Sequence, residues 1–195
     1  MRRFLLVFDL DGTLVDSAPD LRAALNQMLR ERGHPALSLA QVKRMVGDGA
    51  PTMVARALAA SGSDPADLAG ALPRFLEIYE ANAVRLTRPY PKVPETLASL
   101  RGRGYRTSIC TNKPQRATIA VIEGLGLGEL GGRAEASAMI GDSENDAGAA
   151  RAAGVPLVLM RYGYARVDPE SLAADALVGH FAELPEALAR LELMP

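Results

Sequence analysis

Apolar positions along the chain follow two different patterns. Four short, nearly continuous apolar runs lie at residues 4–8, 105–110, 136–140 and 155–160, and such runs are typical of strands buried on both faces. Helical patterns lie between these runs, which predicts βα units and a parallel sheet. We therefore expect an α/β fold.

The segment from residue 17 to about residue 86 has a different pattern. It contains no convincing strand, and its apolar residues recur at helical spacing. One helix is expected to begin at Ser38, a second after the glycine-rich turn at 47–51, and a third over roughly 66–84. Pro73 is expected to bend or divide the last of these helices. The segment therefore predicts a helical module inserted after the first strand.

The insertion sets the expected domain organisation. Residues 1–16 and 87–195 should form the sheet core, and residues 17–86 should form the helical module. The sequence TRPYP at 87–91 should be a stiff linker because its two prolines restrict the backbone.

Composition and charge narrow the possible classes of protein. The chain has 195 residues, 48% of them hydrophobic, and a net charge of -1, which argues against disorder and against a basic nucleic-acid-binding face. Asp9 ends the first apolar run too early for a signal peptide, and no later run approaches a membrane span. Cys110 is the single cysteine and fits a reducing compartment. We expect a cytoplasmic protein, monomer or homodimer, without nucleic-acid or membrane partners.

Two aspartates follow the first predicted strand in the sequence FDLDGT. Side chains alternate along a strand, so Asp9 and Asp11 should share a face. Two crowded carboxylates repel each other unless a positive charge lies beside them. Asp-Gly is also a strong turn signal, so this stretch alone leaves both a turn and a site open.

Polar residues also follow the second and third predicted strands. Thr111, Asn112 and Lys113 end the second strand; a hydroxyl and an amide suit phosphate oxygens, although TNKP is also a plausible turn. GDSEND, with Asp142 and Asp146, ends the third; a helix cap explains one of its acidic residues but not three in five. Parallel sheets bind ligands beyond the carboxyl ends of their strands, so the coincidence favours a site.

These residue types suggest phosphoryl-transfer chemistry. Asp9 and Asp142 would form an oxygen-rich site for Mg2+, which also screens the approach of an anionic phosphate. Asp9 could attack phosphorus to form an aspartyl-phosphate. Asp11 could protonate the leaving oxygen and later activate water.

The motifs DLDGTLVDS, TNKP and GDSEND resemble motifs one, two and four of the haloacid dehalogenase-like superfamily. The helical insertion is similar to its small α-helical cap, and Asp11 resembles the phosphatase branch because dehalogenases lack that second aspartate. VGDGAP, TRPYP and CTNKP specifically resemble phosphoglycolate phosphatases. The resemblance implies a Rossmann-like core, a cap that closes over the substrate, Mg2+ as cofactor, and hydrolysis of a small phosphorylated metabolite, with 2-phosphoglycolate as the favoured candidate.

The resemblance also implies roles for individual residues. Asp9 would be the nucleophile and a magnesium ligand, and Asp11 the acid/base that also gives a backbone carbonyl to the metal. Asp142 would bind the metal, and Asp146 would support the site.

Thr111 and Asn112 would contact the phosphate. The turn that contains Gly47 and Gly49 is either the cap loop that faces the substrate or only a connection between helices.

One departure from the family pattern concerns a catalytic lysine. The family places a strand, a lysine followed by proline, and a crossover helix between motifs two and four, but here no lysine follows Lys113. Losing one preorganised stabiliser typically costs ~100- to 1000-fold in rate. Three alternatives explain this departure. The family segment is truly deleted and Lys113 partly substitutes for its lysine; the protein binds phosphate without turnover; or a segment is missing from the sequence. The last alternative predicts an abnormal Cα–Cα separation between Gly128 and Arg133.

Overall fold

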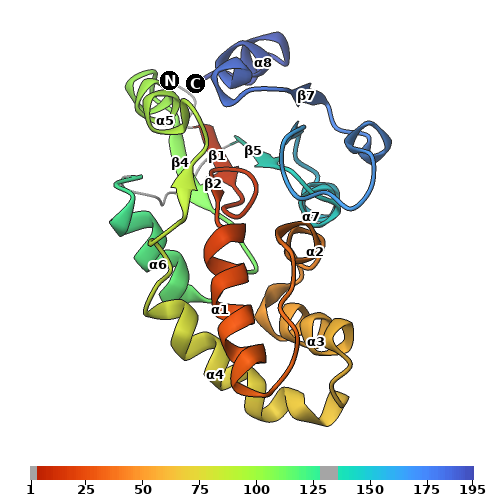
Figure 1. Cartoon of the computed structure of the whole chain (residues 1–195). Helices are drawn as coiled ribbons and strands as arrows, with labels where there is room; N and C mark the ends of the chain where they lie inside the picture. Colours follow the sequence, from red (N-terminus) through yellow and green to blue (C-terminus); the bar gives the residue numbers. More distant parts are fainter. Residues whose placement is uncertain (1–3, 128–135) are drawn as a thin grey trace. The chain divides into compact units, whose positions relative to one another are not determined.

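The computed structural model describes residues 4–127 and 136–195 (Figure 1). The chain divides into two compact units. The sheet unit comprises residues 1–15, 89–111 and 126–195, and the helical unit comprises residues 16–88 and 112–125.

The sheet unit is built on a five-stranded sheet with the order β4-β1-β5-β6-β7, in which all neighbouring strands are parallel. The predicted α/β class is confirmed, as are the four predicted strands; β7 was not predicted. The strands are β1 (Phe4–Phe8), β4 (Arg106–Ile109), β5 (Ala136–Gly141), β6 (Leu157–Met160) and β7 (Ala176–Val178).

The register of the sheet aligns the carboxyl ends of three strands. β1 lies between β4 and β5, and Phe8 is level with Ile109 on one side and Ile140 on the other. The pairing continues past the strand ends, because the Asp9 amide donates to the Ile140 carbonyl at 2.9 Å and the Cys110 amide donates to the Phe8 carbonyl at 2.8 Å. The polar residues that follow these strands therefore begin at one edge of the sheet.

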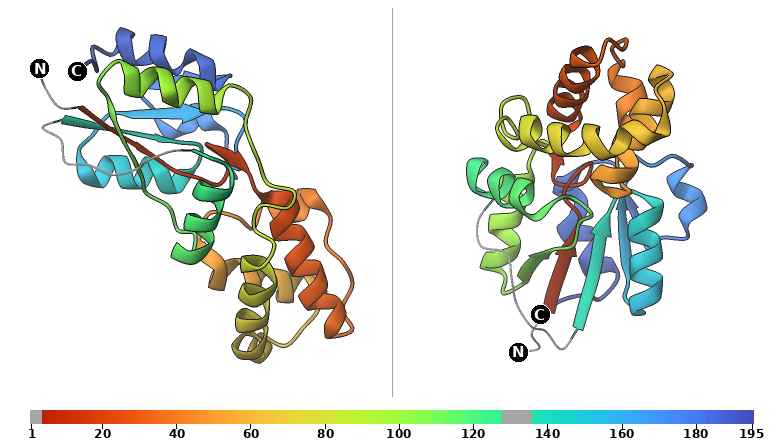
Figure 2. Two further views of the ribbon diagram at one scale, coloured as in Figure 1. Left: turned by 90° about the vertical axis from the view of Figure 1, so that its left-hand side faces the viewer. Right: turned by 90° about the horizontal axis from the view of Figure 1, so that it is seen from below.

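Helices cover both faces of this sheet, as Figure 2 shows. Helices α5 (Val93–Gly102) and α8 (Leu184–Arg190) lie on one face, and α7 (Glu144–Ala153) lies on the other. The α7 face buries a cluster of apolar side chains, since the small residues of this helix allow close packing on β5 and β6. The cluster consists of Met139, Ala147, Ala150, Leu157 and Leu159.

The helical unit packs four helices of the inserted segment with one helix from later in the chain. They are α1 (Ala18–Glu31), α2 (Leu39–Lys43), α3 (Gly49–Ser61), α4 (Leu68–Glu80) and α6 (Gln115–Gly124). Ser38 begins the predicted helix α2 with a capping box, because its hydroxyl accepts from the Gln41 amide while the Gln41 side chain accepts from the Ser38 amide. None of the helices in the described residues is long and apolar enough to cross a membrane.

Pro73 does not divide the predicted helix at 66–84. A short 3-10 turn at Pro65–Asp67 precedes α4, which then continues through Pro73 to Glu80. Proline costs one backbone hydrogen bond within a helix. Burial of Phe75 and Tyr79, whose rings stack at 5.6 Å, offsets that cost.

The two units depart from the predicted domain ranges by one or two residues at each end of the inserted segment, since residues 16, 87 and 88 group with the helical unit, and by a longer segment elsewhere. Residues 112–125, expected in the sheet core, group with the helical unit. The physical reason is that α6 packs against α4, and that Asn112 and Lys113 form hydrogen bonds with residues of the inserted segment.

The start and the end of the inserted segment are fastened together. Strands β2 (Val15–Asp16) and β3 (Arg88–Pro89) form a small two-stranded sheet. Close to them, the buried Asp20 carboxylate accepts from the amides of Leu86 and Thr87 and from the Thr87 hydroxyl, at 2.7–3.0 Å. An anionic acceptor with this many donors forms stronger hydrogen bonds than a neutral one.

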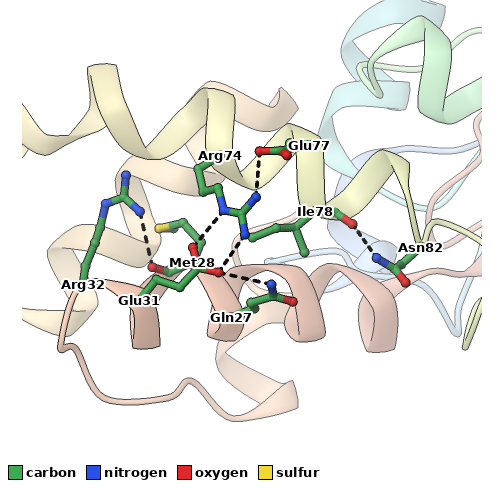
Figure 3. A network of polar contacts seen from close by, with 8 residues as sticks. All are labelled: Gln27, Met28, Glu31, Arg32, Arg74, Glu77, Ile78 and Asn82. Atoms are coloured by element: carbon green, nitrogen blue, oxygen red, sulfur yellow. Dashed lines mark hydrogen bonds and ion pairs between the residues drawn. The ribbon is translucent and has the colours of Figure 1, made fainter.

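An exposed ion-pair network connects α1 with α4 (Figure 3). Arg74 donates through two nitrogens to Glu31, each at 2.8 Å, and through its third to Glu77 at 2.7 Å. Hydrogen bonds from Arg74 and then Gln27 lower the pKa of Glu31 to about 2. Because the network is exposed to solvent, it orients the two helices more than it stabilises them.

Candidate active site

Three carboxylates meet at the carboxyl edge of the sheet. Asp9 directly follows β1, and Asp142 and Asp146 follow β5 in the sequence GDSEND. One oxygen from each carboxylate lies within 4.8 Å of the others. The structure thus brings together Asp9 and Asp142, two of the three residues that the sequence analysis assigned to a metal, with Asp146 beside them.

The Asp142 carboxylate is buried and held at both of its oxygens. Its Oδ1 accepts from the Thr13 hydroxyl at 2.7 Å, and its Oδ2 accepts from the Tyr164 amide at 2.6 Å. Gly163 lies so close that an added Cβ would come within 2.2 Å of the Asp142 side chain, and an added Cβ at Gly12 would come within 2.6 Å. Two chain segments therefore enclose Asp142 on either side.

Asp146 accepts hydrogen bonds from a different set of donors than Asp142 does. Its Oδ2 accepts from the amides of Asp142 and Ser143, both at 3.0 Å, and from the Ser143 hydroxyl at 2.9 Å. The contact from the Ser143 amide is one half of a capping box at the start of α7, and in the other half the Asp146 amide donates to the Ser143 side chain. The helix-cap interpretation of GDSEND thus applies to Ser143 and Asp146, and Asp146 orients the turn that carries Asp142.

Burial raises the pKa values of all three carboxylates, and repulsion by neighbouring carboxylates adds to the shift at Asp9 and Asp142. Burial raises the pKa of Asp9 well above its ordinary value, and the charges of Asp146, Asp142 and Asp11 raise it further. Burial and the charge of Asp146 raise the pKa of Asp142 to about 7. Burial also raises the pKa of Asp146. A cation bound among them would relieve this repulsion, and hard carboxylate oxygens are the ligands that Mg2+ prefers, so the residues fit the ion that the family implies.

The raised pKa values predict a pH-dependent response to Mg2+. The folded protein holds a proton on Asp142 up to about pH 7, whereas the unfolded carboxyl loses it near 3.8, so without metal the free energy of unfolding falls as pH rises between these values. Because Mg2+ competes with that proton, we expect it to raise the melting temperature more at pH 8 than at pH 5. Thermal unfolding with and without Mg2+ measures this. Equal shifts at both pH values would contradict it.

Asp11 lies in a tight loop that joins β1 to β2. The Gly12 amide donates to the Val15 carbonyl at 2.9 Å, and the amides of Leu14 and Val15 donate to the Leu10 carbonyl at 3.0 and 3.1 Å. Gly12 has φ +100°, a backbone conformation that residues other than glycine rarely adopt. The loop returns the chain beside the strand end, with Asp11 two residues from Asp9. The expected metal contact through the Asp11 carbonyl remains a prediction.

Sequence reasoning missed the residues that surround Asp142. These are Thr13, Tyr162, Gly163 and Tyr164, of which the last three follow β6 in the sequence RYGY. Burial and the neighbouring Tyr90 raise the pKa of Tyr162, so its hydroxyl stays a donor. The available signal was the rule that sites lie beyond strand carboxyl ends, applied to the fourth predicted strand as well as to the first three.

The residues predicted to bind phosphate belong to different units. Thr111 belongs to the sheet unit and directly follows Cys110, which pairs with Phe8. Asn112 belongs to the helical unit, where its side-chain amide donates to the Gly47 carbonyl at 2.8 Å. An added Cβ at Gly49 would lie 3.5 Å from the Asn112 carbonyl. The structure therefore brings Asn112 together with the predicted glycine turn.

The Lys113 ammonium is buried in the helical unit. Its Nζ donates to the Tyr79 hydroxyl and lies 4.8 Å from the centroid of the Tyr79 ring. The partial substitution of Lys113 for the family lysine remains a prediction. The abnormal Cα–Cα separation expected between Gly128 and Arg133 lies outside the described residues.

The chain is similar to known hydrolases in sequence and in fold. A family model described as haloacid dehalogenase-like hydrolase matches residues 5–154. A phosphoglycolate phosphatase of Rhodospirillum rubrum is 40% identical over 216 residues, covering 94% of this chain and 90% of its own. A predicted phosphoglycolate phosphatase from Haemophilus somnus has a TM-score of 0.86 at 28% identity, covering 95% of this chain and 98% of its own.

The alignment with the Rhodospirillum rubrum protein is longer than this chain. It spans 216 positions, whereas the chain has 195 residues, so that relative carries residues for which this chain has no counterpart. A phosphoglycolate phosphatase of Cupriavidus necator gives the same result, with 36% identity over 219 positions, covering 97% of this chain and 95% of its own.

Proposed function

Because this chain belongs to the haloacid dehalogenase-like hydrolases, we propose that it is a Mg2+-dependent phosphatase of small phosphomonoesters, with 2-phosphoglycolate as the first candidate. The main support for the proposal is that the carboxylates of Asp9, Asp142 and Asp146 lie close together at the carboxyl edge of the sheet, next to the loop that contains Asp11.

Asp9 and Asp142 would hold the ion, and Asp146 would keep Asp142 in place through the backbone of the turn. When bound, Mg2+ supplies positive charge that lets an anionic phosphate approach an anionic nucleophile. Asp142 has lone pairs left for this purpose because each of its oxygens accepts only one hydrogen bond among those described here.

The two aspartates of the first motif would divide the chemistry between them. An Asp9 oxygen attacks phosphorus, and a bond to Asp9 forms as the bond to the ester oxygen breaks, while Asp11 gives that oxygen a proton. Asp11 then takes a proton from water, and the water oxygen attacks the aspartyl-phosphate. Inorganic phosphate leaves and the Asp9 carboxylate is restored.

A specific observation favours a second candidate, a phosphate-binding or scaffold protein with impaired catalysis. No lysine follows Lys113 in the sequence, and the Lys113 ammonium donates to Tyr79. Among the described strands, β4 has β1 as its one neighbour, so the edge where a further family strand would pair is not covered by a strand. The longer relatives agree with a missing segment.

Phosphate release from a panel of phosphomonoesters, measured with and without Mg2+, separates the two candidates. The panel should include 2-phosphoglycolate, other small alkyl phosphates and p-nitrophenyl phosphate. We expect turnover that requires Mg2+ and is fastest on one small alkyl ester. Mg2+-dependent thermal stabilisation without any phosphate release would instead support the binding protein.

A further inference from the structure

Tyr162 contacts the active-site loop from a segment that the proposed mechanism does not use. It lies in the loop after β6, and its hydroxyl donates to the Thr13 carbonyl at 2.9 Å. Its ring packs against the ring of Tyr90, with the centroids 4.3 Å apart. Tyr162 is only partly exposed, so this packing fixes where its hydroxyl points.

Thr13 is held at both of its polar ends. Its hydroxyl donates to Asp142, and its carbonyl accepts from Tyr162. Thr13 is fully buried, so water cannot readily replace a lost donor at this carbonyl. At the next residue, the Leu14 carbonyl accepts from the Tyr90 amide at 3.0 Å. Tyr162 through its hydroxyl and Tyr90 through its backbone amide thus hold two consecutive residues of the loop.

The same loop carries Asp11, two residues before Thr13. Gly12 lies between them with φ +100°, and glycine restricts the backbone less than any other residue. The position of Asp11 therefore depends both on the hydrogen bonds within the loop and on the contacts that hold Thr13 and Leu14 from outside it. We propose that the Tyr162 hydroxyl positions Asp11 for proton transfer, by fixing the Thr13 carbonyl and so the loop on which Asp11 lies. This inference rests on the proposed phosphatase function.

The proposal has a chemical consequence that depends on the leaving group. An alkyl oxygen is a poor leaving group and needs a proton from Asp11 as the ester bond breaks. A p-nitrophenolate ion leaves without protonation. The value of kcat/KM reports the reaction through release of the leaving group, so a misplaced Asp11 should lower kcat/KM for alkyl phosphates far more than for p-nitrophenyl phosphate.

The test is Tyr162→Phe, which removes the hydroxyl and keeps the ring. We expect kcat/KM to fall about 10- to 100-fold on the best alkyl phosphate of the panel and less than about 3-fold on p-nitrophenyl phosphate, a fraction of the ~100- to 10,000-fold worth of general acid catalysis. Amide hydrogen exchange over residues 10–15 should become faster in the metal-free variant, which reports the loosened loop without any measurement of activity.

Tyr105→Phe is a matched control. The Tyr105 hydroxyl also donates to a backbone carbonyl within the sheet unit, that of Leu193 at 2.8 Å. This variant should leave kcat/KM for both substrates and the amide hydrogen exchange of residues 10–15 unchanged. Equal losses on alkyl and aryl substrates in Tyr162→Phe, or no loss at all, would overturn the positioning role. A wild-type protein without phosphatase activity would overturn the proposed function, and this result is distinct from either outcome.

Discussion

Replacing Asp9 with Asn is expected to abolish phosphoryl transfer and, at the same time, to stabilise the metal-free protein. An amide cannot act as the nucleophile, so kcat should fall by ~10^4-fold or more, as for other catalytic nucleophiles. Asp9 carries a pKa well above its ordinary value because desolvation and the charges of Asp146 and Asp142 disfavour its ionised form, so its charge opposes folding at neutral pH. The neutral amide removes that charge. Each 1 kcal/mol of released repulsion should raise the melting temperature by about 2–4 °C.

Steady-state phosphate release and thermal unfolding at pH 8 without Mg2+ measure the two effects. A damaged fold would lower both activity and stability, so opposite changes point to the nucleophile itself. Asp11→Asn is the matched control, since it makes the same change two residues away. It should slow turnover strongly yet still release p-nitrophenolate in a first, partial turnover. Near-wild-type activity in Asp9→Asn would rule out the aspartyl-phosphate route.

Replacing Gly163 with Ala should have the second-largest effect, although Gly163 carries no functional group. The added Cβ would lie 2.2 Å from Asp142, closer than van der Waals contact allows, so the carboxylate must move. Moving it would also disturb its hydrogen bonds from Thr13 and from the Tyr164 amide. We expect the apparent Mg2+ affinity to weaken ~10- to 100-fold, which is the usual cost of disturbing groups that orient a metal ligand.

Gly148→Ala is the control for this substitution. Gly148 is an exposed residue of α7 in the same unit, and an added Cβ there would meet nothing within 4 Å. It should stabilise the protein by roughly 0.5–1 kcal/mol, because alanine loses less backbone entropy in a helix than glycine does. Mg2+ titrations followed by thermal shift compare the two variants. Wild-type Mg2+ affinity in Gly163→Ala would show that the Asp142 carboxylate tolerates displacement.

The strands of the sheet could be predicted well because each is a local apolar run that ends in polar residues. All four predicted strands lie in the sheet, and only β7 escaped prediction. β7 has three residues, Ala176–Val178, too few for a periodic signal. Pro73 was expected to bend or divide its helix, and it does not divide it, because packing of the α4 side chains outweighs the local preference against proline.

The site could be predicted as far as its residues follow strand ends. Asp9, Asp142 and Asp146 were found in this way. Their surroundings could not be found, because the contacts of Gly163 and Tyr162 depend on how closely two distant loops approach, and no local pattern records such a distance. The grouping of α6 with the helical unit is similar, since the sequence shows an amphipathic helix but not the surface on which it packs.

The chain segments that make up the helical unit also constrain the order in which the protein can fold during its synthesis. The unit takes residues 16–88 and 112–125 from two separate parts of the chain, and the stretch between them belongs to the sheet. A nascent chain that has emerged only as far as residue 88 lacks α6, so the face of α4 that α6 covers stays open. Residue 125 must leave the ribosome before the helical unit is complete. Its folding is therefore delayed until β1 and β4 are already available to pair.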